Sequence, residues 1–219
     1  MGLSTLQYKH CCGDSWYREG ETNLLERMNQ ILQLSPEFTE VITWNDAGES
    51  HYIGPSWPET VTPEILQYGD TDVNPHTGWQ PLISSFINAF KSGASDTSAM
   101  VPTNGASFAG AMCGGARDTV VYAVVLPAGT QGFQVRVSSG GQVIATQSVA
   151  AGLSYNSIDG LKTGAQLLEL LDSNGNVIAE ASSKVDVSDQ PTNGFCNFNY
   201  YVEGWFPGAL TPSDVEIFI

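Results

Sequence analysis

The chain has 219 residues, which fits one large domain or two small ones but falls short of the about 250 residues of a complete (β/α)8 barrel. Charged residues make up only 14% of it and hydrophobic residues 42%, so the chain can build a core beneath a neutral, polar surface. The formal net charge is −15, and no basic run is present to neutralise phosphates. Nucleic acids and anionic membrane surfaces are therefore excluded as favoured partners, and no apolar stretch of about 18 residues predicts a membrane span.

The first 93 residues alternate between helix-like and strand-like patterns. Apolar residues recur at helical spacing over residues 22–34, which predicts an amphipathic helix. Residues 41–44 predict a short β-branched and aromatic strand, and residues 79–91 predict a second amphipathic helix. Residues 53–78 are rich in Pro and Gly and too irregular to assign. The alternation is typical of a parallel α/β sheet or barrel.

The composition changes near residue 93, where we place a domain boundary. Residues 94–105 are small and polar, as in a linker. Beyond them, short hydrophobic segments separated by turns predict β-strands at residues 119–126, 132–138, 142–149, 166–171 and 177–187. Strands at this spacing predict an antiparallel β-sandwich over residues 106–219. The fold class predicted for the whole chain is thus α/β plus all-β.

Four cysteines are present, and their spacing matches no zinc motif. Cys11 and Cys12 are adjacent, and we expect no bond between them because neighbouring side chains diverge. We expect them to be buried thiols, with bridges to something outside this chain as the alternative. Cys113 and Cys196 both lie in the β-rich part and could close a long loop as a disulfide, with two buried thiols as the alternative.

The densest cluster of chemically active side chains directly follows the strand at residues 41–44. Asp46 and Glu49 are separated by Ala and Gly, so a turn at Gly48 would let the two carboxylates converge. Glycoside hydrolysis requires such a pair, one carboxyl protonated and the other ionised. The structural alternative is that Asp46 caps the loop while Glu49 is only solvated.

Aromatic and polar side chains flank the two carboxylates. Trp44 and Tyr52 would offer flat faces for sugar rings, and Asn45 and His51 would bond to hydroxyl groups; packing of Trp44 in the core is the alternative. Asp46, Glu49 and His51 could also bind a metal. Their spacing matches no zinc site, and calcium takes more oxygen ligands, so we expect no metal and no cofactor.

Several segments together resemble a known family. They are Leu6–His10, Trp16–Glu21, Ile42–Gly54 and His76–Trp79 with the helix that follows. In order and spacing they are similar to the closing segments of the fungal α-1,3-glucanases, or mutanases, of glycoside hydrolase family 71. The resemblance covers residues 1–93 and is looser beyond them. It implies the C-terminal fragment of a (β/α)8 TIM barrel, whose last strand–helix units are residues 1–93, followed by an antiparallel β-sandwich.

The resemblance also implies an activity and a site. The family hydrolyses α-1,3-glucan with inversion, and its acidic pair falls on Asp46 and Glu49. We assign Glu49 as general acid and Asp46 as base or electrostatic support. The substrate-binding residues that follow from the resemblance and the cluster are Trp44, Asn45, His51, Tyr52, Tyr8, His10 and Trp16. The family implies a monomer that acts outside the cell or at the cell wall, although no signal peptide is visible in this chain.

The resemblance further implies barrel strands that precede the segments matched here. We therefore expect activity to require that N-terminal barrel portion. The alternative function is a non-catalytic glucan-binding or cell-wall-associated remnant, in which the sandwich and the aromatic residues hold the polymer without cleaving it. A further alternative is a chain that does not fold alone.

Overall fold

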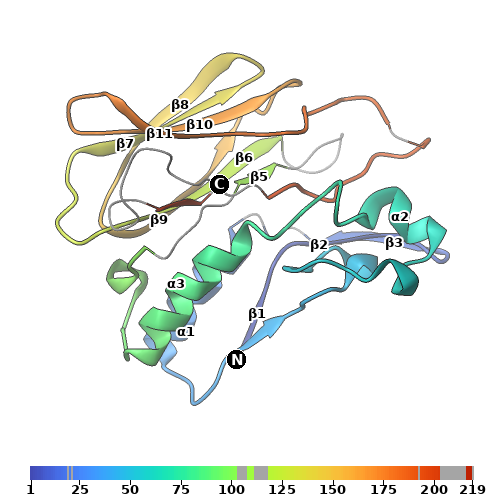
Figure 1. Ribbon diagram of the computed structural model, residues 1–219, viewed down its shortest axis with the longest axis horizontal. Coiled ribbons are helices and arrows are strands. Elements are labelled where there is room, and N and C mark those ends of the chain that lie inside the picture. Colours follow the sequence, from blue (N-terminus) through green and yellow to red (C-terminus); the bar gives the residue numbers. More distant parts are fainter. Residues whose placement is uncertain are drawn as a thin grey trace.

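The computed structural model in Figure 1 describes residues 1–18, 20, 22–102, 108–110, 118–191, 193–202 and 216–218. The chain combines helices and sheets, and most of its strands are antiparallel. The described residues form no closed barrel. Two antiparallel sheets lie above a layer that contains the long helices, and a smaller hairpin with a short helix lies beside that layer (Figure 1).

The described residues form three α-helices and three 3-10 turns, namely α1 (Asn23–Leu34), η1 (Ala47–Glu49), η2 (Pro58–Thr60), α2 (Pro63–Gly69), α3 (Trp79–Lys91) and η3 (Thr97–Ala99). α1 and α3 confirm the two predicted amphipathic helices. Each buries one apolar face, with Leu25 and Met28 of α1 and Leu82 and Phe86 of α3 almost fully buried. α2 lies in the stretch that the pattern left unassigned. With only seven residues, it is too short to show a helical period.

The N-terminal strands form two small sheets. β1 (Gly2–Ser4) pairs in parallel with β4 (Glu40–Ile42). β4 corresponds to the strand predicted at residues 41–44, but it ends two residues earlier than predicted. β2 (Gln7–Cys11) and β3 (Asp14–Arg18) form an antiparallel hairpin that the sequence pattern did not predict. The parallel pair places the start of the chain beside the segment that leads into the acidic cluster.

The remaining strands form two antiparallel sheets. In the first, β6 (Thr119–Leu126) pairs with β9 (Gly152–Asp159) along its whole length, and with β5 (Phe108–Gly110) and β12 (Glu216–Phe218) over shorter stretches. The second has the order β11 (Val177–Ser182), β10 (Gln166–Leu171), β7 (Phe133–Ser139), β8 (Gln142–Val149). β6, β8 and β10 confirm their predicted ranges. β9 was missed because its residues are mostly polar and half-buried.

β6 connects two hydrophobic cores. Successive residues of a strand point to opposite faces. Val120 and Val124 belong to a core shared with β7 and β10, whereas Val121 and Val125 belong to the core that contains α1 and α3. This explains why the whole strand is buried and apolar. The core that contains α1 and α3 therefore includes residues from both sides of the linker predicted at residues 94–105.

None of the helices in the described part of the chain has both the length and the apolar character that a membrane span needs.

Candidate active site

The two carboxylates of the acidic cluster project from one short turn, η1. Asp46 caps this turn, because its Oδ1 accepts a hydrogen bond from the backbone N–H of Glu49 at 3.1 Å. The N–H of Asp46 in turn donates to Oγ1 of Thr43 at 3.1 Å. The phenol of Tyr68, in α2, donates to the carbonyl of Gly48 at 2.9 Å. The turn is thus held at its start and at its centre.

His51 lies between the two carboxylates. Its Nε2 lies 3.2 Å from Oδ2 of Asp46 and 3.7 Å from Oε2 of Glu49. The imidazole side chain is only 6% exposed, whereas the side chains of Asp46 and Glu49 are 41% and 42% exposed. The acidic groups therefore face solvent above a buried ring. The structure brings together these three predicted site residues.

The environment of Asp46 favours its ionised form. The hydrogen bond from His51 contributes most to lowering the pKa of Asp46, and the backbone N–H groups of Glu49 and Gly48 lower it further. Partial burial opposes them but does not cancel them. Asp46 is therefore a carboxylate at neutral pH, as a base or an electrostatic stabiliser requires.

The geometry of the cluster bears on metal binding and on stereochemistry. Among the described residues, one ligand atom each of Asp46, Glu49 and His51 lie within 4.8 Å of one another, so they could together contact a cation. The absence of a bound metal stays a prediction. The 4.8 Å limit also applies to the two carboxylates, so an oxygen of Asp46 and an oxygen of Glu49 lie closer together than the carboxyl groups of inverting enzymes, which are about 6.5–9.5 Å apart.

Trp44 presents an aromatic face next to the acidic turn. The residue is 55% exposed, and the neighbouring Asn45 is half-buried. A Cβ on Gly54 would lie 2.4 Å from Cε2 of Trp44, so the indole rests directly on backbone that has no side chain. The backbone N–H of Gly54 also donates to the carbonyl of Trp44 at 2.7 Å. A supported, exposed indole is suited to stack on a sugar ring.

Both tyrosines that were predicted to bind substrate are buried instead. Tyr52 is 0% exposed and Tyr8 is 3% exposed. The phenol of Tyr52 donates to the carbonyl of Asn74 at 2.5 Å, and that of Tyr8 donates to the carbonyl of Cys196 at 3.1 Å. Both tyrosines therefore lie in the core, where Tyr8 bonds β2 to the C-terminal segment and Tyr52 bonds the chain after the acidic turn to residue 74.

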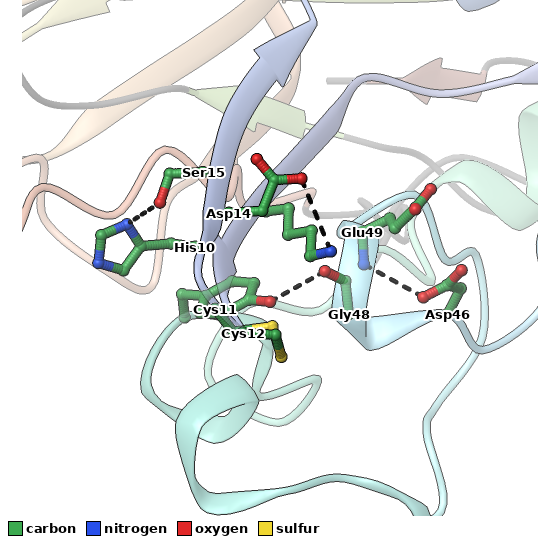
Figure 2. Close-up of a disulfide and its surroundings, with 10 residues drawn as sticks. His10, Cys11, Cys12, Asp14, Ser15, Asp46, Gly48 and Glu49 are labelled. Atoms are coloured by element: carbon green, nitrogen blue, oxygen red, sulfur yellow. Dashed lines mark hydrogen bonds and ion pairs between the residues drawn. A yellow bond between two sulfur atoms is a disulfide. The ribbon is translucent and has the colours of Figure 1, made fainter.

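His10 and Trp16 lie on the β2–β3 hairpin. His10 stacks on Phe195 at 4.1 Å between ring centroids. Its Nδ1 lies 3.1 Å from Oγ of Ser15, a contact that Figure 2 shows. Trp16 lies beneath the guanidinium of Arg18 at 5.0 Å. Strand β2 of the hairpin contacts η1, so His10 lies on a strand next to the acidic turn, whereas Trp16 lies on the neighbouring strand β3.

A disulfide at the tip of this hairpin corrects the expectation that Cys11 and Cys12 are buried thiols with no bond between them (Figure 2). Cys11 is half-buried and Cys12 is exposed. Cys12 and Gly13 form a two-residue turn with φ of 63° and 79°. Cys12 has therefore left the strand conformation in which neighbouring side chains diverge. Cys113 lies outside the described residues, and Cys196 bonds to no described cysteine, so the Cys113–Cys196 disulfide stays a prediction.

Sequence reasoning missed the residues that hold the cluster from below. Gln7 contacts the far side of His51, with its Nε2 2.6 Å from Nδ1. Tyr68 supports η1, and Asn199 donates to the phenol of Tyr52 at 3.0 Å. Gln7 stood inside a family-like segment, but no local pattern in the sequence connects it to a residue 44 positions away.

A half-exposed carboxylate pair on one turn, with one member held ionised and an indole beside it, offers the side chains that hydrolysis of a glycosidic bond requires. The family model for glycosyl hydrolase family 71 matches residues 1–213, and the chain belongs to this family.

Two curated relatives are similar to this chain. The glucan endo-1,3-alpha-glucosidase agn1 of Schizosaccharomyces pombe is 37% identical over 89 residues, which are 41% of this chain and 20% of that protein. The mutanase Pc12g07500 of Penicillium rubens is 30% identical over 191 residues, which are 80% of this chain and 41% of that protein. The chain therefore spans less than half the length of either relative. No solved structure is significantly similar to it.

Proposed function

We propose that this chain carries the acid–base pair of an α-1,3-glucan hydrolase of the glucan endo-1,3-α-glucosidase type. The observation that carries the proposal is the shared turn of Asp46 and Glu49 above His51, in a chain of glycosyl hydrolase family 71. The names of the relatives, an endo-1,3-alpha-glucosidase and a mutanase, supply the substrate class. No cofactor enters this scheme.

The two carboxyl groups receive different roles in the proposal. Asp46 accepts hydrogen bonds from His51 and from the backbone, which keep it ionised, so it acts as base or electrostatic support. Glu49 acts as the general acid that protonates the leaving oxygen. The exposed indole of Trp44, with Asn45, would contact the sugar, while the buried side chains of His51, Tyr8 and Tyr52 support the turn from the core.

Inversion at the anomeric carbon is part of the proposal and sets a geometric demand. A water molecule must fit between the acid and the base, which needs about 6.5–9.5 Å between the carboxyl groups. Because the side chain of Glu49 is 42% exposed, it has room to rotate away from His51 when substrate binds. Proton NMR of the first product formed would identify the anomer and so test inversion.

The wider organisation is also a proposal. Residues 1–93 would be the last strand–helix units of a (β/α)8 barrel, residues 94–105 a linker and residues 106–219 a β-sandwich. The parallel pairing of β1 with β4 and the antiparallel sheets beyond them support this division. We propose that the full substrate groove uses segments that the relatives carry beyond the matched span, in a monomeric protein that acts on wall glucan outside the cell.

The test is release of reducing sugars from insoluble α-1,3-glucan by this chain and by a longer protein with the matching barrel. Glu49→Gln and Asp46→Asn should each lower the rate by about 10²–10⁴-fold, because general acid–base catalysis contributes that much. Glu37→Gln, which removes an exposed acid elsewhere, should leave the rate unchanged.

Binding to the same polymer separates the proposed enzyme from a glucan-binding protein without activity. If both proteins bind the glucan, release nothing and are indifferent to Glu49→Gln, the hydrolase proposal is wrong. The non-catalytic alternative would then account for the cluster.

A further inference from the structure

The ring of His51 makes polar contacts on both of its edges. On one edge, Nε2 faces Asp46 at 3.2 Å and Glu49 at 3.7 Å. On the other, Nδ1 faces Nε2 of Gln7 in β2 at 2.6 Å and Oγ of Ser4 in β1 at 3.5 Å. The ring is therefore held between the two N-terminal strands and the acidic turn, with only 6% of its side chain exposed.

The position of the imidazole proton follows from these contacts. A neutral imidazole carries one N–H, which donates, and one bare nitrogen, which accepts. If the hydrogen were on Nδ1, it would face the amide N–H₂ of Gln7, while bare Nε2 faced the carboxylate of Asp46. Both contacts would be repulsive. With the hydrogen on Nε2, both become hydrogen bonds.

The other orientation of the Gln7 amide leads to the same result. Turned by half a rotation, its carbonyl oxygen would accept from Nδ1–H, and Nε2 would still have to donate to Asp46, so the ring would be imidazolium. In either orientation Nε2 carries a hydrogen. An amide at position 7 thus suits both charge states of His51, whereas a carboxylate would suit only the imidazolium.

We infer that Gln7 is a positioning residue, which fixes a proton on Nε2 of His51 so that the ring donates to Asp46 and holds that carboxylate in place beside Glu49. Gln7 acts through His51 and touches neither carboxylate in any described hydrogen bond. The catalytic consequence rests on the proposed function of the acidic pair. The proton position does not, since it follows from contacts within this chain.

The experiment is a long-range ¹⁵N–¹H correlation spectrum of the full chain, which distinguishes Nε2–H, Nδ1–H and imidazolium rings. The chain has three histidines, so His51→Gln assigns the relevant signals. At pH 7.5 the His51 of the parent chain should show Nε2–H. The other titratable groups around it are Asp46 and Glu49 on one side, with His76 coupled to it electrostatically.

Two variants test the role of Gln7. In Gln7→Glu, the new carboxylate should stabilise imidazolium, so the protonated ring persists to a pH about one unit higher or more. In Gln7→Met, Nδ1 loses its amide partner and only Asp46 still favours Nε2–H, so a measurable minor share of the Nδ1–H tautomer should appear beside Nε2–H. Gln33→Glu, the same charge change at an exposed position of α1, should leave the His51 spectrum as it is.

An Nδ1–H tautomer in the parent chain, or a His51 spectrum that does not respond to Gln7→Glu and Gln7→Met, would overturn the inference. Where hydrolysis is measured, Gln7→Met should lower kcat about tenfold with little change in KM, and Gln7→Glu should shift the pH–rate profile rather than only lower it. Loss of activity in Glu49→Gln tests the proposed function alone, because that readout is independent of the spectrum of His51.

Discussion

At the scale of single residues, the position of the acidic pair depends on the close contact between η1 and α2. Gly69, at the end of α2, lies directly against the backbone of Ala47, the first residue of η1. A Cβ on Gly69 would lie 2.4 Å from the carbonyl oxygen of Ala47 and 3.1 Å from Cγ2 of Ile65. Two backbone segments thus meet at a distance that no side chain at position 69 permits.

Gly69→Ala should therefore displace η1. Elsewhere in a helix this change is favourable, but here the carbonyl must move, and overpacking of this kind costs about 1–3 kcal/mol of the free energy of unfolding. Urea denaturation would measure it, and any hydrolytic rate should fall with it. The matched control is Gly2→Ala, where the nearest atom is 3.5 Å from the new Cβ. Equal stability of Gly69→Ala and Gly2→Ala would contradict the prediction.

Residue patterns in the sequence predicted part of this site and not the rest. The proximity of Asp46 and Glu49 follows from a local turn, which the Gly between them makes visible. His51 follows Glu49 by two residues, so it was predicted as part of the same local cluster. The support from Gln7 and Tyr68 depends on pairings between distant elements, which no local pattern encodes. The burial of Tyr52 is of the same kind, because an aromatic residue beside a polar loop looks the same whether it faces sugar or core.

At the scale of secondary structure, α1 ends in a conformation that its sequence does not favour. Ser35 follows the helix with φ 45° and ψ 55°, the left-handed region that Gly adopts without cost, and its N–H donates to the carbonyl of Ile31 at 2.9 Å. The cap therefore has the right hydrogen bond but not the residue best suited to it.

Ser35→Gly should raise the free energy of unfolding by about 0.5–1 kcal/mol, because the left-handed penalty of about 1–2 kcal/mol is removed while the unfolded chain gains freedom. Thermal and urea unfolding would measure the change. The control is Ser84→Gly, at an exposed position inside α3, which should lower stability by about half a kcal/mol. A loss of stability in both variants would show that the cap is not strained.

The helices and strands were predicted correctly where a single pattern of apolar residues continues over many residues without interruption. α1 and α3 each repeat apolar residues over three turns, and β6 is an uninterrupted apolar run. The β2–β3 hairpin was missed because its turn is Cys12–Gly13 rather than the Asn–Gly or Asp–Gly typical of such turns. The same unusual turn hid the disulfide of Cys11 and Cys12.

At the scale of the whole molecule, one buried histidine connects the N-terminal part to the C-terminal segment. The ring of His76 lies between those of Tyr52 and Tyr200, with centroids 3.9 Å and 4.0 Å away. Its Nδ1 lies 2.9 Å from the carbonyl oxygen of Tyr52, and its Nε2 lies 3.0 Å from that of Tyr200. Nearby, the N–H of Val202 donates to the carbonyl of Pro75 at 2.9 Å. The sequence did not predict the contacts between His76 and Tyr200, because 124 residues separate the two.

This burial makes the stability of the chain depend on pH. Complete burial lowers the pKa of His76 from 6.5 to about 4, and the two carbonyl groups oppose it only in part. In the unfolded chain the pKa returns to about 6.5. Between pH 6.5 and 4 the unfolded state therefore binds more protons than the native state, so stability falls as the pH is lowered through this window. The full loss from this group is on the order of 3 kcal/mol.

Urea unfolding of the parent chain at several pH values between 7 and 4 would measure this loss. His76→Gln should flatten the pH dependence, although it lowers stability at pH 7 by removing a stacked ring. His10→Gln, at a half-buried position on the hairpin, should leave the slope over this window nearly unchanged. If His76→Gln is too unstable to study, the proton spectrum of the parent chain serves instead, because His76 should stay neutral down to about pH 4. A His76 ring that is already protonated at pH 6 in the folded chain would refute the prediction.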